Sequence, residues 1–386
     1  MRHRIQSIPR RTRATNRDRE FAEAGLLAGV PEGAAREARL KLLRELAARG
    51  VPFEEMQRAI EQDRLVFLLL DRELSGEPRY TAREVAKKVG MPLEYLLAAR
   101  EAAGLALPEP DERVYTDDDV ETARVIAELR TSGIPDEGLL EITRVLGRSL
   151  AQGAEVIRAV SAEAFIESGM TEYELARRNA EAASRFLPQM APLLLNILRL
   201  HLRDLVRNQA LSQEELAAGA ARNASTVFVG FADIVGFTGL GERVELGELG
   251  ALGARLTELA LRHMKPPARL VKTIGDAVMF VAPAPGPLLD TALELVEQVE
   301  GEGEDFPELR AGVAAGLAVS REGDWYGPPV NLASRVTGVA RPGSVLATQE
   351  VHDAAPDGYE WSDAGARHLK GLTRRVPLYR VRRSVT

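Results

Sequence analysis

The chain contains no cysteine, which excludes disulfide bridges, thiolate metal sites and thiol nucleophiles and fits a reducing cytoplasm. It has no surplus of positive charge either. Its 386 residues carry a formal net charge of -7, which argues against a general binder of nucleic acid or anionic membranes. It also lacks a long apolar run, because the best candidate, Phe186 to Leu198, falls well short of the roughly 20 residues that a membrane span needs. We therefore expect a cytoplasmic protein with no membrane span.

The first 20 residues are rich in arginine but have no apolar core, so they do not form a secretory signal. We expect residues 1–20 to be a solvated, disordered tail. Contact of this tail with a phosphate-rich surface is the less favoured alternative.

Residues 21–180 show a helical pattern with a recurring punctuation unit. Glycine, an apolar residue, proline and then an acid follow one another from Gly29, Gly50, Gly90 and Gly133, with a variant at Gly169. Glycine suits the left-handed end of one helix, proline the first turn of the next, and the acid that helix's positive end. The pattern predicts an all-helical domain of short helices, spaced too unevenly for a solenoid, and we expect it to be a regulatory domain on the grounds given below.

Within this domain, a helix-turn-helix segment is expected over residues 80–120. Its second helix, Pro92 to Arg100, offers a single arginine, and an acidic stretch follows between Glu109 and Glu121. The segment resembles MerR-like DNA-binding units, but contacts to phosphates need the opposite charge. We therefore expect a regulatory scaffold and no DNA binding.

A helical linker is expected over residues 181–221, with a broad apolar face and a second helix start near Ser212. The alternatives are a plain core helix and a helix that transmits state to the next domain. His201 in this stretch is a candidate pH switch, because histidine titrates near neutrality, although an ordinary exposed histidine is the more common case. An apolar ligand held among the leucine-rich helices is a further hypothesis.

Residues 222–386 change to alternating strands and helices in the order β-α-β-β-α-β, which predicts an α+β, ferredoxin-like domain with appended elements. Asp233 follows the first strand, and Asp276 lies at the turn of a hairpin. Because a crossover makes the first two strands parallel, both acids are expected on the same side of the sheet. A single aspartate at a strand end is usually a turn residue, but this explanation is weaker for a pair.

Two carboxylates with no cysteine and no nearby histidine suit Mg²⁺ or Mn²⁺. A site with two ions about 3.5–4 Å apart can activate an attacking oxygen and hold a phosphate. Phe237 and Thr238 lie in the segment that leads toward the next helix, whose N–H groups could bind phosphate oxygens.

Four segments, FADIVGFT, KTIGDAVMF, GDWYGPPVNLASR and HLKG, together resemble the class III nucleotide cyclases over residues 225–382. The N-terminal half is similar to the regulatory domain of actinobacterial adenylyl cyclases, including pH-responsive members. The resemblance implies conversion of ATP to 3',5'-cyclic AMP and pyrophosphate, two Mg²⁺ or Mn²⁺ ions in each active site, and a homodimer whose active sites lie at its interface.

The resemblance also assigns roles to residues. The metal ions would be held by Asp233, Ile234 and Asp276, and adenine would be selected by Lys272 and Asp324. The ribose and the phosphorus would be acted on by Asn331 and Arg335. The terminal phosphates would be bound by Lys370 and Arg310. A lysine donates to adenine N1 and an aspartate accepts from the N6 amine, whereas guanine presents the inverted pattern. The metal acids would come from one subunit, and the residues that bind the base, orient the ribose and stabilise the transition state from its twin.

Taken one at a time, each of these residues has an ordinary explanation as a turn residue or a surface cation. Trp325 and the pair Pro328–Pro329 make an unusual approach to the helix that carries Asn331. Two other classes of function stay open: a catalytically silent nucleotide-binding signalling module, and a DNA-binding regulator. A diguanylate cyclase is the nearer enzymatic alternative, but no GG[DE]EF stretch is present.

Overall fold

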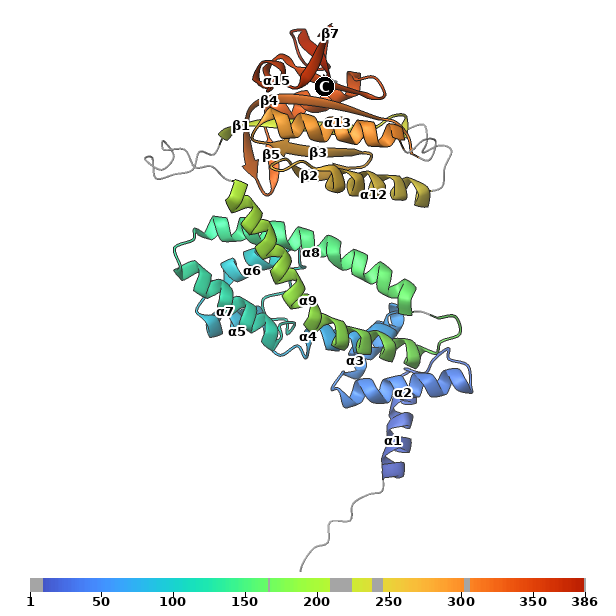
Figure 1. The fold of residues 1–386 in the computed structure, drawn as a ribbon. Helices are drawn as coiled ribbons and strands as arrows, with labels where there is room; N and C mark the ends of the chain where they lie inside the picture. The colour runs from blue at the N-terminus through green and yellow to red at the C-terminus, as the bar shows by residue number, and fades with distance from the viewer. Residues whose placement is uncertain (1–9, 166, 209–223, 238–245, 302–305, 385–386) are drawn as a thin grey trace, which may run out of the picture. The chain divides into compact units, whose positions relative to one another are not determined.

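The computed structural model describes residues 10–165, 167–208, 224–237, 246–301 and 306–384. The contacts divide the chain into two compact units, residues 1–204 and 205–386 (Figure 1). Among the residues described, no helix combines the length and the apolar character needed to cross a membrane.

Helices build the first unit. They are α1 (Arg10–Glu23), α2 (Ala34–Ala48), α3 (Phe53–Glu61), the 3-10 turn η1 (Leu65–Phe67), α4 (Leu68–Ser75), α5 (Ala82–Val89), α6 (Leu93–Ala102), α7 (Asp117–Thr131), α8 (Asp136–Phe165) and α9 (Glu172–Asn208). The glycines of the punctuation units lie between helices, as expected. Gly50, Gly90 and Gly133 have φ angles of +80°, +69° and +92°, which a residue without a Cβ adopts without strain. Pro52 and Pro92 stand immediately before the first helical residue of α3 and α6.

Residues 10–20 correct the expectation of a disordered tail over residues 1–20, because α1 begins at Arg10. Asp18 of α1 accepts two hydrogen bonds from Arg44 of α2, with N–O distances of 2.8 and 2.5 Å. Phe21 is completely buried. An apolar anchor and an ion pair to α2 therefore dock a segment whose arginine content suggested a solvated chain.

Two separate apolar clusters stabilise the first unit. The first joins α1 to α4 with the start of α9, where Ala176 and Ala180 are buried. The second joins α5, α6 and α7, and capping boxes at Thr81 and Thr116 begin α5 and α7. The expected helix-turn-helix segment thus has a core of its own. The expected linker boundary at residue 181 lies inside α9, which is continuous from Glu172 to Asn208, and the expected helix near Ser212 lies outside the described residues.

The second unit is a mixed sheet with helices on both faces, and its α+β class is the one that the sequence predicted. Its elements are β1 (Ala224–Ile234), α12 (Leu246–His263), β2 (Arg269–Ile274), β3 (Ala277–Ala282), α13 (Pro285–Gly301), β4 (Leu309–Arg321), β5 (Asp324–Tyr326), α14 (Pro328–Val339), β6 (Ser344–Thr348), α15 (Gln349–Ala354), β7 (Tyr359–Arg367) and β8 (Val376–Arg383). The strand order is β2-β3-β1-β4-β6-β8-β7, with β5 paired to β4. The part from β1 to β4 is the expected ferredoxin-like unit.

The residues of β1 show how the two faces are filled. Phe228, Ala232 and Ile234 pack into the cluster that holds α12 and α13, whereas Val227, Val229 and Phe231 pack into the cluster beneath α14. Successive side chains of a strand point to opposite faces, so apolar residues at every position produce a strand buried on both sides. Asp233, the last residue but one of β1, lies on the face of α14 and is part of the strand that it was expected to follow.

Candidate active site

The two acids expected to hold metal come together at one corner of the sheet. Asp233 lies opposite Ala277 of β3 on one side and opposite Arg310 of β4 on the other. The backbone N–H of Ile234 donates to the carbonyl oxygen of Asp276 at 3.1 Å, which fixes the β2–β3 turn beside the end of β1. Gly275 makes this turn possible with a φ of +60°.

Arg310 forms an ion pair with Asp233. Its Nε and Nη2 atoms donate to Oδ2 of Asp233 at 3.0 and 2.6 Å, and the side chains of Arg310 and Asp233 are 28% and 18% exposed. Burial raises the pKa of Asp233 from 3.8, the Arg310 hydrogen bond lowers it, and the negative charge of Asp276 raises it again, with a net upward shift. The charged form of Asp233 is therefore disfavoured, and a cation bound beside it would stabilise that form.

The carboxylates of Asp233 and Asp276 suit a hard divalent ion, because their ligand atoms are oxygens. Ile234 is 1% exposed, and its side chain has no atom that binds a metal ion. This residue can therefore offer only its backbone carbonyl oxygen. Within the described ranges no group of three or more histidine, cysteine, aspartate or glutamate side chains is placed to hold a metal. The corner thus supplies two carboxylates and leaves the other ligand positions to backbone, water and phosphate oxygens.

Lys272 and Asp324, the expected base-reading pair, meet across β2 and β5. Nζ of Lys272 donates to Oδ2 of Asp324, and the backbone N–H of Trp325 donates to Oδ1 at 2.8 Å. Both carboxylate oxygens are therefore oriented by donors from this chain. The guanidinium of Arg269 lies 5.7 Å from the centre of the Trp325 ring, a neighbour that the sequence did not single out.

Helix α14 carries the residues expected to act on ribose and phosphorus. Asn331 is exposed, whereas Arg335, one turn later, is half-buried. A Cβ placed on Gly371 would lie 3.3 Å from Nη2 of Arg335, so this guanidinium lies against the segment that contains Lys370. Lys370 itself is exposed. The backbone next to Lys370 therefore lies close to Arg335, although 35 positions separate the two residues in the sequence.

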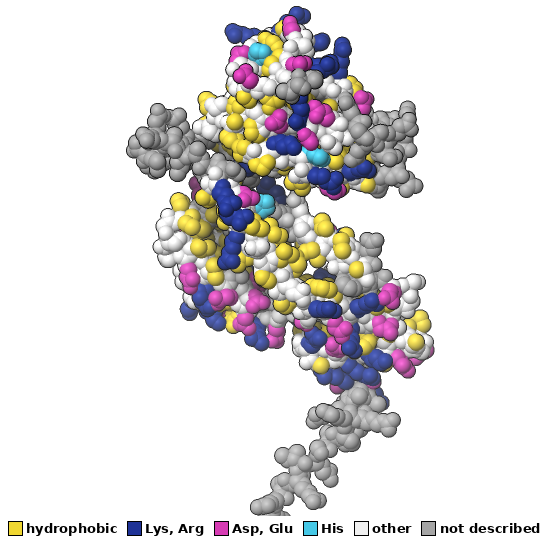
Figure 2. Space-filling model, viewed as in Figure 1, with side chains coloured by type: hydrophobic (Ala, Val, Ile, Leu, Met, Phe, Trp, Pro, Cys, Tyr) yellow, Lys and Arg dark blue, Asp and Glu magenta, His cyan; other side chains and the backbone are white. Residues whose placement is uncertain are grey.

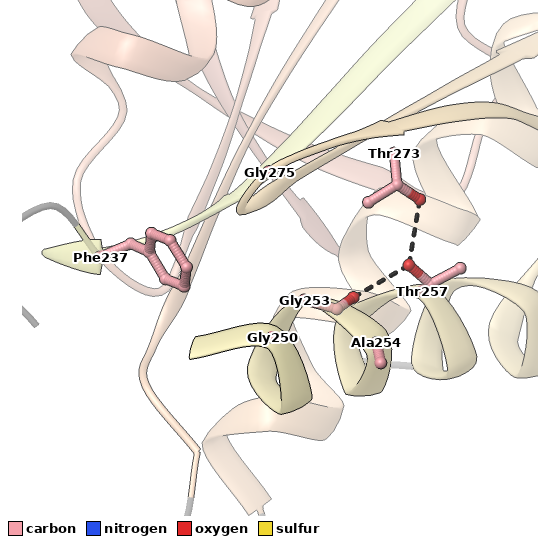
Figure 3. A pocket seen from close by; sticks show the side chains of 7 residues that line it. All are labelled: Phe237, Gly250, Gly253, Ala254, Thr257, Thr273 and Gly275. Atoms are coloured by element: carbon pink, nitrogen blue, oxygen red, sulfur yellow. Dashed lines mark hydrogen bonds between the residues drawn. The ribbon is translucent and has the colours of Figure 1, made fainter. Parts of the chain in front are cut away.

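A cavity of about 420 Å³ opens between α12 and the turn that carries Asp276 (Figure 3). It is lined by Phe237, Gly250, Gly253, Ala254, Thr257, Thr273 and Gly275. The hydroxyls of Thr257 and Thr273 lie 3.0 Å apart across it. Sequence reasoning identified only Phe237 among these residues, and the missed signal was the run of small residues on one face of α12. Thr238, expected beside Phe237, lies outside the described residues.

The structure thus brings Asp233, Asp276 and Arg310 into one group and Lys272 and Asp324 into another. His201 belongs to neither, because it is exposed on α9 of the first unit, close in sequence to an ion pair of 3.9 Å between Arg203 and Asp204.

Comparison with known proteins gives a consistent result for both halves. Residues 19–206 match the family described as adenylate cyclase regulatory domain, and residues 220–382 match the adenylate and guanylate cyclase catalytic domain. Over 383 residues the sequence is 42% identical to the pH-sensitive adenylate cyclase MT1302 of Mycobacterium tuberculosis (strain CDC 1551 / Oshkosh), covering 96% of this chain and 95% of that protein.

A second relative and one solved structure are also similar to this chain. An adenylate cyclase of Streptomyces griseus is 32% identical over 311 residues, which cover 77% of this chain and 74% of the relative. The crystal structure of the adenylyl cyclase CyaB from P. aeruginosa matches with 25% identity and a TM-score of 0.35, and covers 42% of this chain and 96% of that one.

Proposed function

This chain belongs to the adenylate cyclases that join a regulatory domain to a class III catalytic domain, and from this membership we propose how its residues form cyclic AMP. A symmetric homodimer binds ATP, the ribose 3'-oxygen attacks the α-phosphorus, the hydroxyl proton is lost and pyrophosphate leaves. The observation that carries the proposal is that the carboxylate pair and the base-reading pair both form within one catalytic unit.

Asp233, Asp276 and the carbonyl oxygen of Ile234 hold two Mg²⁺ or Mn²⁺ ions. When bound, these ions supply Lewis acidity that eases loss of the 3'-hydroxyl proton and offsets charge on the phosphates. Lys272 donates to adenine N1, and Asp324 accepts from the N6 amine. Because the Trp325 N–H already orients Asp324, little reorganisation is needed to read the base.

The remaining groups act on the ribose and the phosphates. Asn331 orients the ribose, and Arg335 stabilises the pentavalent phosphorus with a permanent charge and a forked set of donors. Lys370 and Arg310 bind the terminal phosphates, and the backbone around Phe237 and Thr238 assists them.

Two features support the proposed homodimer. The residues for ribose and phosphates include exposed side chains, Asn331 and Lys370, which are accessible to a second chain. Large apolar side chains also remain exposed along α8 and α9, where apolar residues gather on the face shown in Figure 2. They include Leu146, Leu150, Val156, Ile157, Val160, Leu193, Leu194, Ile197, Leu202 and Leu205, which are between 42% and 63% exposed. Apolar surface on this scale marks an interaction site.

The substrate assignment is tested by incubating purified protein with Mn²⁺ and either ATP or GTP, and separating the products by chromatography. Cyclic AMP from ATP, with little cyclic GMP from GTP, is expected. If GTP is converted as fast as ATP, Lys272 and Asp324 do not select adenine over guanine. The absence of either cyclic product would favour the silent nucleotide-binding module.

The shared site is tested by mixing two inactive variants, Asp233→Ala and Arg335→Ala. Random exchange of subunits makes about half of the dimers mixed, and each mixed dimer holds one intact site of two, so about a quarter of the wild-type activity should return. The control mixes each variant with itself under the same conditions. No recovery, despite subunit exchange shown by mass spectrometry, would rule out the shared arrangement.

Regulation by pH is proposed because the M. tuberculosis relative is named pH-sensitive. His201 is the candidate switch, and loss of the pH response in a His201→Ala variant is the expected result. An unchanged pH profile would exclude it. An apolar ligand among the exposed leucines of α9 is the second candidate signal, and mass spectrometry of the denatured protein should then detect a co-purified lipid.

A further inference from the structure

Arg310 makes contacts that its expected role on the phosphates does not explain. Two of its nitrogens donate to the same carboxylate oxygen, Oδ2 of Asp233, at 3.0 and 2.6 Å. Its third nitrogen, Nη1, donates to the carbonyl oxygen of Gly338 at 3.3 Å. Gly338 lies in the last turn of α14, three residues after Arg335. One side chain thus bridges a carboxylate expected to bind metal and the helix that carries Asn331 and Arg335.

We propose that Arg310 is a clasp: it occupies one oxygen of Asp233, Oδ2, and it must leave this oxygen before an ion can bind to it. This inference rests on the proposed function, because it takes Asp233 as a metal ligand. It adds a positioning role to Arg310, which links the state of the carboxylate pair to the end of α14.

The physical reason is competition between cations for one oxygen. The two strands set Arg310 and Asp233 directly opposite each other, so the contact is built into the sheet register. A guanidinium keeps its charge at every physiological pH, so its repulsion from an incoming ion cannot be relieved by losing a proton. The side chains are largely withdrawn from solvent, which weakens screening of this repulsion. Movement of the side chain is the remaining way to admit the ion.

Movement of Arg310 has two consequences. It frees a forked cation for the phosphates, so that binding of an ion prepares binding of the nucleotide. It also removes a donor from the carbonyl of Gly338, which changes the hydrogen bonding of the last turn of α14. In the proposed dimer this helix serves the site opposite to the one that Asp233 serves. The clasp therefore couples the metal state of one active site to Arg335 in the other.

The test measures Mn²⁺ binding to the full-length chain by electron paramagnetic resonance, without nucleotide. In Arg310→Met the aliphatic stem remains but the competing charge is lost, and about tenfold tighter Mn²⁺ binding is expected. Arg310→Lys should lie between this variant and the wild type. Arg321→Met, the same change at the other end of β4, is the matched control and should bind like the wild type.

Hydrogen exchange gives a second readout that a purely structural role of Arg310 would not produce. In the wild type, Mn²⁺ should speed exchange in the last turn of α14, while Arg310→Met should show fast exchange there with or without Mn²⁺. Unchanged or weaker Mn²⁺ binding by Arg310→Met would overturn the clasp. Undiminished Mn²⁺ binding by Asp233→Asn would instead overturn the metal assignment, so the two failures are distinguishable.

Discussion

Replacing Gly312 with alanine should displace α14 from the sheet. Gly312 lies in β4 beneath this helix, and a Cβ at this position would stand 2.3 Å from the backbone nitrogen of Thr337 and 2.7 Å from its Oγ1 atom. Thr337 is 3% exposed, and its hydroxyl donates to carbonyl oxygens of Ala333 and Phe231 at 2.9 and 3.3 Å. The backbone of a helix cannot rotate away from a clash as a side chain can.

The size of the effect follows from these distances. Ordinary contact begins near 3.4 Å, so the separation must grow by about 1 Å, the difference between 3.4 and 2.3 Å. Overpacking of this kind costs about 1–3 kcal/mol of unfolding free energy. Because α14 carries Asn331 and Arg335, a shift of about 1 Å should also lower kcat by up to about a hundredfold.

The matched control is Gly316→Ala, four residues further along β4 and on the same face. A Cβ there would lie 3.6 Å from atoms of Pro329, which is an ordinary contact. Urea unfolding and cyclic AMP formation, measured side by side, should show a loss for Gly312→Ala and little change for Gly316→Ala. Equal behaviour of the two variants, or wild-type stability and rate for Gly312→Ala, would show that this contact does not place α14.

Two further predictions concern charged groups. Because the pKa of Asp233 is raised on folding, its ionisation costs stability as the pH rises above 3.8. Asp233→Asn should therefore unfold at a higher temperature than the wild type in metal-free buffer at neutral pH, with a difference that vanishes near pH 3; a gap that widens on acidification would contradict this sign. Arg39 of α2 donates to both oxygens of Glu172 at the start of α9, at 2.5 and 2.6 Å, and is 11% exposed. Arg39→Met should lower the unfolding free energy of the first unit by about 1–2 kcal/mol in urea titrations, and Arg158→Met, in an exposed pair within α8, should leave it unchanged.

Local signals in the sequence were enough to predict much of the second unit. The turn at Gly275 and Asp276, the helix around Asn331 and the first strand of the unit all follow from residue pattern and turn chemistry. Their order fixes the ferredoxin-like topology through the handedness and parallel direction of crossovers. The expectation that both acids share one edge of the sheet depended only on this order of elements, and the structure confirmed it.

The contacts that depend on register and on distant packing were not predictable in this way. Nothing local to Arg310 indicates that it faces Asp233, since this requires the alignment of β1 with β4 to the single residue. The helix α1 was missed because its stability comes from Phe21 and from a partner on α2, not from its own composition. The small residues of α12 that line the cavity become meaningful only when the β2–β3 turn is placed against them.

The entrance to α14 has a consequence for the direction in which a nucleotide lies. A helix usually begins with several unpaired N–H groups that attract anions. Here Pro328 and Pro329 provide none, and the N–H of Val330 donates to the carbonyl oxygen of Gly327 at 3.2 Å. A triphosphate therefore finds little to hold it at this end of the helix, and the cationic side chains near its far end become the preferred anchor. The two prolines thus disfavour the reversed orientation of the substrate, in which its phosphates would lie at the start of α14.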